Sequence, residues 1–205
     1  MKSISLAACV WLLYLTPYAA QAASKDTSFR DPVGNRVQQI QLDIDAPIAK
    51  VWWALTTSEG FQTWAAPVAH VTLGNDGMIE ASYRMTAKIG DPDNIKNRIV
   101  AYVPEHLLVL RNEHAPKNIP FSAEAFGQIR TVIEVQDLGG GRTRVIESGV
   151  GYGEGKDFDS VYSHFRTGNA EEFDLLEKSL TKGPIDWKAE MDTVDASIKT
   201  PTAEN

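Results

Sequence analysis

The sequence predicts one α+β domain in which antiparallel strands form a sheet and the helices lie to one side of it. Hydrophobic and polar residues alternate with a period of two in six to seven segments, and turn residues join most of these segments in pairs. A long segment with helical spacing follows the last strand. The chain has 205 residues, of which 43% are hydrophobic and 23% are charged, so it is long enough to enclose a core and has a globular composition.

The first part of the domain is predicted to be one strand followed by two short helices. Residues 36–46 alternate between apolar and polar side chains, which is typical of a half-buried strand. Helices are expected over residues 48–57 and 58–64. The first helix has an apolar stripe at i, i+3, i+4 and i+7, formed by Ile48, Val51, Trp52 and Leu55.

Trp53 lies well off this stripe, because successive helical residues are about 100° apart. An isolated exposed Trp, a site for a protein partner and a contact with the C-terminal tail would each explain its position. Some apolar residues of the tail have no evident core position, namely Trp187, Met191 and Val194. We expect the tail to cover Trp53, and a protein partner at Trp53 is the alternative.

The remaining strands are predicted in pairs. Gly, Asn and Asp residues supply the turn of the first pair, Pro104 marks the corner of the second, and three consecutive glycines separate the strands of the third. The predicted ranges are 69–73, 79–85, 97–103, 107–111, 128–136 and 142–152.

The connection over residues 112–127 is long for a compact domain. Connections above about 12–15 residues are often lids or binding loops. This one carries Phe121 and Phe126. We therefore expect it to act as an apolar lid.

A long terminal helix is predicted between Asp157 and Gly183, where a Gly-Pro pair ends it. Gly168 is a point at which this helix could bend or divide. The apolar stripe of the helix comprises Phe158, Val161, Tyr162, Phe165, Phe173, Leu176 and Leu180.

Residues 1–22 have the features of a signal peptide: a basic residue, an apolar run shorter than a membrane span, and a small-residue cleavage site ending at Ala22. We therefore expect an exported protein, secreted or periplasmic, without stable membrane insertion after the signal is removed. Residues 23–35 are expected to be an N-terminal linker, residues 36–183 the folded domain, and residues 184–205 a C-terminal tail.

Charge and residue spacing exclude several classes of function. Loss of Lys2 with the signal changes the net charge from −7 to −8, which disfavours nucleic acid as a partner. Cys9 is the single cysteine and lies within the signal, so a thiol nucleophile and a cysteine-ligated metal site are not expected. No serine-nucleophile motif is present. The four histidines lack metal-ligand spacing, so we expect no metal and no cofactor; they are His70, His106, His114 and His164.

Glycines recur at every second position over residues 149–155, and at this period they lie on one face of a strand. They do not complete the G-x-G-x-x-G pattern of a dinucleotide-binding loop. A bare strand face allows either a close approach by another element or an open cavity. We favour close packing.

Three stretches carry a resemblance to a known superfamily: "IDAPIAKVWWALTTSEGFQTW", "VPEHLLVLR" and "FRTGNAEEFDLLEKSLTKGPIDW". With the order of elements, they resemble the START-like, or SRPBCC, helix-grip superfamily over about residues 36–187, and most closely its polyketide cyclase-like and chaperone-ATPase-activator-like branch. The resemblance implies a curved antiparallel sheet wrapped around the long C-terminal helix, with a deep apolar cavity between them. It does not imply one activity.

Such a cavity would be lined by aromatic side chains and a few polar ones that orient a ligand. For Arg98 and Arg111 the outer face of the sheet is an open alternative, because both lie near strand ends. The predicted ligand-binding residues are Trp64, Tyr83, Arg98, Arg111, Phe121, Phe126, Tyr152 and Phe165.

Three functions are compatible with this domain. The first is binding of a small hydrophobic or amphipathic molecule, including a lipid, without catalysis. The second is an enzyme of the cyclase, dehydratase or hydrolase type that uses general acid–base chemistry on a hydrophobic substrate, with His70, His164 or Tyr152 beside Arg111 as candidates. The third is a protein-interaction module like the chaperone activators of this superfamily.

Overall fold

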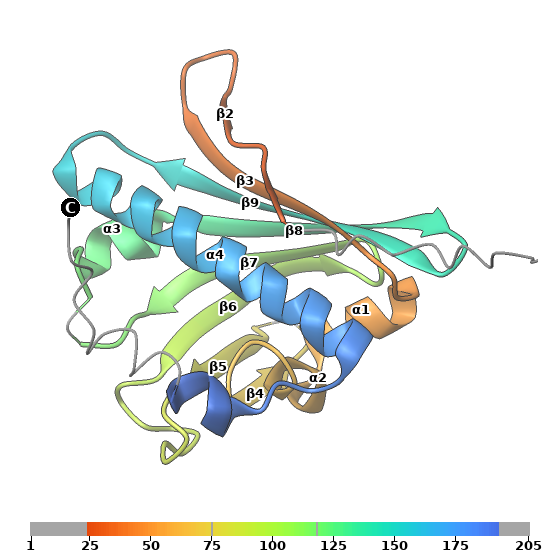
Figure 1. Ribbon diagram of the computed structural model, residues 1–205. Helices are drawn as coiled ribbons and strands as arrows, with labels where there is room; N and C mark the ends of the chain where they lie inside the picture. The colour runs from red at the N-terminus through yellow and green to blue at the C-terminus, as the bar shows by residue number, and fades with distance from the viewer. Residues whose placement is uncertain (1–23, 75, 118, 193–205) are drawn as a thin grey trace, which may run out of the picture.

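A computed structural model of the protein describes residues 24–74, 76–117 and 119–192. It shows a large, curved, unclosed antiparallel sheet of nine strands, with one long helix lying diagonally across the sheet (Figure 1). The strand order is β1-β3-β9-β8-β7-β6-β5-β4, and β2 also pairs with β3. The α+β helix-grip prediction is therefore confirmed, with two strands more than the upper end of the predicted range.

The helices and strands follow the predicted order. The strands are β1 (Lys25–Asp26), β2 (Phe29–Arg30), β3 (Arg36–Ile44), β4 (Val68–Thr72), β5 (Met78–Ser82), β6 (Ile95–Val103), β7 (Leu107–His114), β8 (Arg130–Gly139) and β9 (Arg142–Tyr152). The helices are α1 (Ile48–Thr56), α2 (Ser58–Gln62), α3 (Ala123–Gln128) and α4 (Lys156–Lys182).

The two additional strands come from the segment that we expected to be a linker. β1 and β2 pair antiparallel with β3, with Lys25 opposite Gln41 and Phe29 opposite Val37. Each strand has two residues and is exposed. Two residues are too few to produce a readable alternation, which explains why the sequence pattern did not reveal them.

The main core lies between the inner, concave face of the sheet and the helices α1 and α4. Alternate residues of β3 and β9 point inward, as the period-two pattern predicted. α4 is one continuous helix of 27 residues, so Gly168 does not divide it. The fully buried side chains of this core include Ile40, Leu42, Ile44, Val51, Leu55, Ile79, Leu108, Val145, Phe173 and Leu176.

The two tryptophans of α1 have different environments. Trp52 packs against the main core, whereas Trp53 is 40% exposed. The chain after α4 attaches to α2: Ile185 N donates to Thr63 O at 2.9 Å, and Trp187 Nε1 donates to Gln62 O at 2.7 Å. The expected contact of the tail with Trp53 stays a prediction, and Val194 lies outside the described residues.

The predicted signal peptide, residues 1–22, also lies outside the described residues. Within the described part of the chain, no helix has both the length and the apolar character that crossing a membrane requires.

Candidate functional site

An aromatic cluster fills the end of the grip where α4 begins. The rings of Phe121 and Phe126 are stacked with centroids 6.1 Å apart, and Phe126 stacks on Phe165 at 6.0 Å. Tyr152 meets Tyr162 edge to face at 5.0 Å. We call the group formed by Phe121, Phe126, Tyr152, Tyr162 and Phe165 the aromatic cluster. It brings together four of the eight predicted ligand-binding residues.

The long connection reaches this cluster because it is attached to the start of α4. The Ser122 backbone N–H donates to Asp157 Oδ1 at 3.0 Å, and the Ser122 hydroxyl donates to the other oxygen of the same carboxylate. The Ser122 hydroxyl oxygen also caps α3 by accepting from Ala125 N at 3.0 Å. Ser160 donates to Pro120 O at 2.9 Å. The connection that we predicted as a lid thus lies against α4 and places Phe121 and Phe126 inside.

Next to the aromatic cluster, polar side chains lie inside the grip. Gln38 of β3 is 0% exposed, Glu147 of β9 is 7% exposed, and Asn169 of α4 is 8% exposed. Asn169 Nδ2 donates to Gln38 Oε1 at 3.2 Å and also to Glu147 Oε1. At the edge of the grip, Tyr83, which lies just after β5 and is exposed, donates its hydroxyl to the half-buried Glu172 of α4. We call Gln38, Tyr83, Glu147, Asn169 and Glu172 the polar cluster.

The two carboxyl groups of the polar cluster have no arginine or lysine partner among the ion pairs of the described residues. Burial, reinforced by the charge of Glu172, raises the pKa of Glu147 to about 8, against the hydrogen bond from Asn169, which lowers it. Burial also raises the pKa of Glu172, although the hydrogen bond from Tyr83 lowers it. At neutral pH Glu147 is therefore mostly a neutral carboxylic acid.

Tyr152 joins the two clusters, and Gly149 makes room for its hydroxyl. A Cβ atom added at Gly149 would lie 2.5 Å from the Tyr152 hydroxyl oxygen and 3.1 Å from Gln38 Oε1. Burial, and then the charge of Glu147, raises the pKa of Tyr152. At Gly153 an added Cβ would lie 2.7 Å from the Phe158 ring. Gly149, Gly151 and Gly153 are therefore closely packed, as we favoured, whereas Gly155 meets open space; the prediction of one strand face is wrong for Gly153 and Gly155, because β9 ends at Tyr152.

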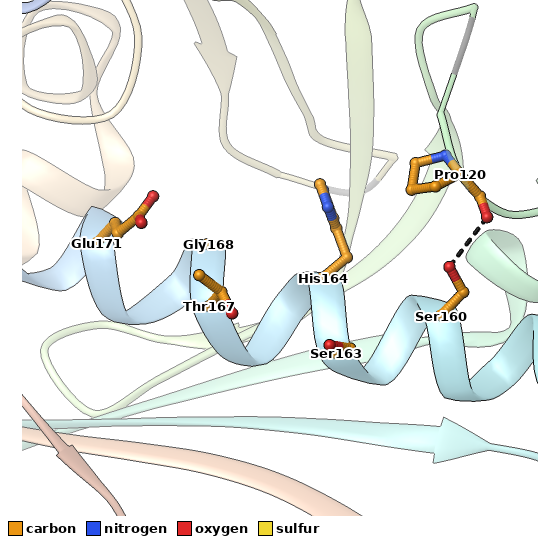
Figure 2. Close-up of a pocket in the computed structure, with 7 residues that line it drawn as sticks. All are labelled: Pro120, Ser160, Ser163, His164, Thr167, Gly168 and Glu171. Carbon is orange, nitrogen blue, oxygen red and sulfur yellow. Dashed lines mark hydrogen bonds between the residues drawn. The ribbon is translucent and has the colours of Figure 1, made fainter. Parts of the chain in front are cut away.

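A groove runs along α4 beside these clusters, with a volume of about 550 Å³ (Figure 2). Gly168 contributes no side chain to it, and an atom added at its Cβ position would meet nothing within 4 Å. Asn169 of the polar cluster is the next residue along the helix. The groove is lined by Pro120, Ser160, Ser163, His164, Thr167, Gly168 and Glu171.

The remaining predicted ligand-binding residues lie elsewhere. Trp64 belongs to the main core and donates its ring N–H to Ala54 O at 2.9 Å, so its polar atom is satisfied internally. Tyr83 is 43% exposed and lies at the edge of the grip, where its hydroxyl joins the polar cluster by donating to Glu172.

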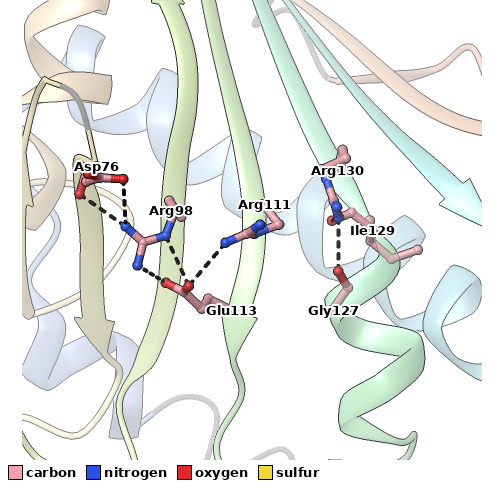
Figure 3. Close-up of polar contacts among 7 residues, drawn as sticks. All are labelled: Asp76, Arg98, Arg111, Glu113, Gly127, Ile129 and Arg130. Carbon is pink, nitrogen blue, oxygen red and sulfur yellow. Dashed lines mark hydrogen bonds and ion pairs between the residues drawn. The ribbon is translucent and has the colours of Figure 1, made fainter.

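Arg98 and Arg111 lie on the outer face of the sheet, since their strand neighbours Ile99 and Leu110 are buried in the main core. They are paired in register across β6 and β7. Both bind Glu113, Arg98 with one N···O distance of 2.9 Å and Arg111 at 3.2 Å (Figure 3). Both arginines therefore lie on the face opposite α4, which was the open alternative to a position in the cavity.

The four histidines are separated from one another. His164 lines the groove and contacts Phe121, whereas His70 is exposed on β4 next to Thr72. The acid–base candidates His70, His164 and Tyr152 therefore do not meet at Arg111. No group of three or more metal-ligating side chains is found within residues 24–192, the two undescribed positions excepted.

Four residues of the polar cluster were not predicted from the sequence: Gln38, Glu147, Asn169 and Glu172. Three of these had a readable signal. Gln38 has the same inward phase as Ile40, and Glu147 the same inward phase as Val145. Asn169 lies four residues before Phe173 on the apolar stripe of α4. A polar residue in an inward phase indicates a buried polar group, which needs a partner or a function.

The family model described as Activator of Hsp90 ATPase homolog 1-like protein matches residues 45–181, which is more than half of the chain. The chain belongs to this family. The resemblance to the SRPBCC helix-grip superfamily is thereby confirmed, because the family is of this type. Comparison with curated protein sequences gave no match.

Solved structures of the same fold have low sequence identity to this chain. The Aha1 dimer from Colwellia psychrerythraea has 17% identity and a TM-score of 0.53, with 72% of this chain and 97% of that chain covered. CalU16 from Micromonospora echinospora has 14% identity and a TM-score of 0.54, with 87% and 99% covered. MLL2253 from Mesorhizobium loti has 18% identity and a TM-score of 0.56, with 73% and 100% covered. At these identities the likeness shows the fold alone.

Proposed function

We propose that this domain binds a small amphipathic molecule between α4 and the inner face of the sheet. The aromatic cluster would contact the apolar part of the ligand, and the polar cluster would orient its polar end. The observation that carries the proposal is Tyr152: its ring belongs to the aromatic cluster, and its hydroxyl is buried beside Gln38 without a hydrogen-bond partner. Buried polar atoms are rarely left unpaired unless a ligand or water completes them.

The groove along α4 gives such a ligand a route to the interior. Its volume of about 550 Å³ falls within the range of about 300–1,000 Å³ that is usual for small-molecule sites. The ring of His164 touches both Phe121 and Phe165, at centroid distances of 5.2 and 6.1 Å, so the groove borders the aromatic cluster. A ligand in the groove would therefore lie next to the aromatic cluster, with the ring of His164 between them.

Two substitutions at Gly168 test the groove, because an atom added there meets open space. Gly168→Leu should fill the groove and weaken binding of the uncharged fluorescent probe N-phenyl-1-naphthylamine by roughly 10-fold, equivalent to the loss of a few apolar contacts. Gly168→Ala is the matched control. It should bind nearly normally and unfold with a free energy about 1 kcal/mol higher, since Ala is the better helix former.

Titration of the probe by fluorescence and native mass spectrometry of the purified full chain give the measurement. Probe binding that is equally tight in both variants would show that the groove is not the route. No binding of the probe to the wild-type chain, together with no co-purified small molecule, would sink the proposal itself.

An acid–base enzyme is the second candidate, and the polar cluster rather than the histidines favours it. Glu147 is held neutral and Glu172 accepts a hydrogen bond from Tyr83, so one group could donate a proton and the other accept one. The test is exchange of the methyl protons of 2-acetylnaphthalene in D₂O, followed by NMR. Exchange catalysed by the wild-type chain and lost in Glu172→Gln would support an enzyme, and no exchange above that of the buffer would exclude this chemistry.

We further propose that the protein is exported after cleavage at Ala22. For Trp53, 40% exposed, contact with the C-terminal tail remains our expectation, and binding of a protein partner is the alternative proposal. Intact mass and N-terminal sequencing of the secreted or periplasmic protein test the first proposal. A mature chain that still begins at Met1 would contradict it. For the second, Trp53→Ala should abolish any association that the wild-type chain shows, while leaving probe binding unchanged.

A further inference from the structure

We infer that the polar end of the site receives an uncharged carbonyl oxygen, such as that of a ketone, which accepts hydrogen bonds from the Tyr152 hydroxyl and the Gln38 side-chain amide. The inference rests on the proposed function and specifies the chemical class of the ligand. It assigns a binding role to Gln38 and Gly149, and a hydrogen-bonding role to the Tyr152 hydroxyl.

The first step is that two neighbouring buried side chains each have a polar atom without a partner. Within the described residues, four buried side-chain nitrogen or oxygen atoms have no hydrogen-bond partner, and two of them are Gln38 Nε2 and the Tyr152 hydroxyl. Gln38 is 0% exposed and Tyr152 is 7% exposed. Both side chains border the Cβ position of Gly149, which lies 2.5 Å from the Tyr152 hydroxyl oxygen and 3.1 Å from Gln38 Oε1, the other polar atom of the Gln38 amide. Any larger residue at Gly149 would displace them.

The second step is that both unpaired groups can donate a hydrogen bond: the NH₂ group of Gln38 and the O–H group of Tyr152. Gln38 Oε1 already accepts from Asn169 Nδ2 at 3.2 Å, so the unused group of this amide is its NH₂. The opposite orientation of the Gln38 amide would place two NH₂ groups against each other, which the hydrogen-bond network excludes. Glu147 Oε1 likewise accepts from Asn169. The site therefore lacks an acceptor, and a ligand oxygen would supply it.

The third step is that the acceptor is neutral. The polar cluster contains two carboxyl groups and, among the described ion pairs, no arginine or lysine that binds them, so a ligand carboxylate would be buried without a cation to stabilise its charge. A ligand ammonium would add donors and leave Gln38 Nε2 unpaired. Burial raises the pKa of Glu147 to about 8, so this carboxyl also offers no full negative charge to a cation at neutral pH. An uncharged carbonyl satisfies the donors at the lowest desolvation cost.

Three naphthalenes of similar size separate these possibilities: 2-acetylnaphthalene carries a ketone, 2-ethylnaphthalene carries none, and 2-naphthoate carries a charge. The variant Tyr152→Phe removes only the hydroxyl. Tyr162→Phe, on the ring that packs against Tyr152, is the matched control. The affinities are measured by fluorescence titration, and the ketone C=O stretching frequency of the bound probe is measured by infrared spectroscopy.

We expect the ratio of ketone to ethyl affinity to fall roughly 3- to 10-fold in Tyr152→Phe and to stay constant in Tyr162→Phe, since one hydrogen bond to an uncharged group is lost. The C=O frequency should be lowered in the wild-type complex and shift back toward its value in an apolar solvent in Tyr152→Phe. A purely structural role of Tyr152 would change both affinities equally and leave the frequency unaltered.

The outcomes separate the two proposals. An affinity ratio and a C=O frequency unaffected by Tyr152→Phe, or tighter binding of 2-naphthoate than of the ketone, would overturn the inference while the binding function stands. If Tyr152→Phe leaves the affinity ratio and the C=O frequency unchanged, an ordered water rather than a ligand satisfies Tyr152 and Gln38. Failure of all three naphthalenes to bind would overturn the proposed function as well.

Discussion

The acidic residues on the outer face of the sheet and those inside the grip have pKa values shifted in opposite directions. On the outer face, Asp43 accepts two hydrogen bonds from Arg144, at 2.6 and 2.7 Å, and this contact lowers the pKa of Asp43. Glu113, also on the outer face, is bound by Arg98 and has a lowered pKa for the same reason. On the inner side, Glu147 and Glu172 have raised pKa values because they are buried.

The difference separates two uses of a carboxyl group. Paired carboxylates at a partly exposed surface are ordinary and contribute little each to stability. A buried carboxyl without a cation destabilises the fold when it ionises, so its presence in the interior calls for another explanation than stability. The inner side of the grip is therefore where function is expected, and the outer arginines are explained by their ion pairs.

The largest expected effect is on Glu147. Its pKa is about 8 in the folded chain against a usual 4.5, so the proton binds more tightly to the folded state. The stabilisation is complete below about pH 4.5 and is lost as the pH rises through about 8, by an amount on the order of 3–5 kcal/mol. Glu147→Gln keeps the acceptor for Asn169 and removes the titration. Urea unfolding between pH 5 and pH 9 should show this loss in the wild type and not in the variant.

The exposed outer residue Glu134 of β8 provides the control for that experiment. Glu134→Gln should keep the pH dependence of the wild type. If Glu147→Gln and the wild type lose stability in parallel over the same pH range, Glu147 is ionised throughout, and the contrast between the faces is wrong.

A smaller effect with the opposite sign is expected for Asp43. Because its pKa is lowered, its contribution is present above the usual value of 3.8 and is lost as the pH falls below it. Asp43→Asn should therefore lower the free energy of unfolding by roughly 0.5–1 kcal/mol at pH 7 and have almost no effect at pH 2.5. Asp45→Asn, in a more exposed pair with Arg142, is the comparison and should cost less. An equal cost at both pH values would contradict this account of Asp43.

The smallest effect on ligand binding is expected for Arg111. It lies on the outer face, so Arg111→Gln should leave the affinity for N-phenyl-1-naphthylamine unchanged within about 2-fold. Gly168→Leu measured in the same titration provides the contrast, with the roughly 10-fold loss expected for a blocked groove. A 10-fold loss in Arg111→Gln would show that the ligand contacts the outer face.

Much of the fold could be predicted from sequence because its elements have regular periods. All seven strands from β3 to β9 coincide with segments of alternating residues, and α4 coincides with the helical stripe that ends at Gly183. β1 and β2 could not be predicted, since two-residue strands depend on pairing with β3 rather than on their own pattern.

The site could be predicted only in part. The large aromatic residues near α4 were predicted to lie in the interior. The structure brings Phe121, Phe126, Tyr152 and Phe165 together in one cluster. The side on which Arg98 lies was not readable near its strand end, and a bulge between Ile99 and Ala101 interrupts the alternation. Glu172 lies at the border of the buried stripe of α4, and only its contact with Tyr83, from a distant part of the chain, reveals its environment.

The protonation of Glu147 tests the contrast between the two faces most directly. Its side-chain carboxyl carbon can be labelled with ¹³C and titrated by NMR, with Glu147→Gln used for assignment. The account predicts a midpoint close to pH 8, far above that of Asp43, which should titrate below 3.8. A midpoint near 4.5 for Glu147 would mean that the carboxyl is hydrated or paired at neutral pH, and the contrast between the outer face and the inner side of the grip would then be wrong.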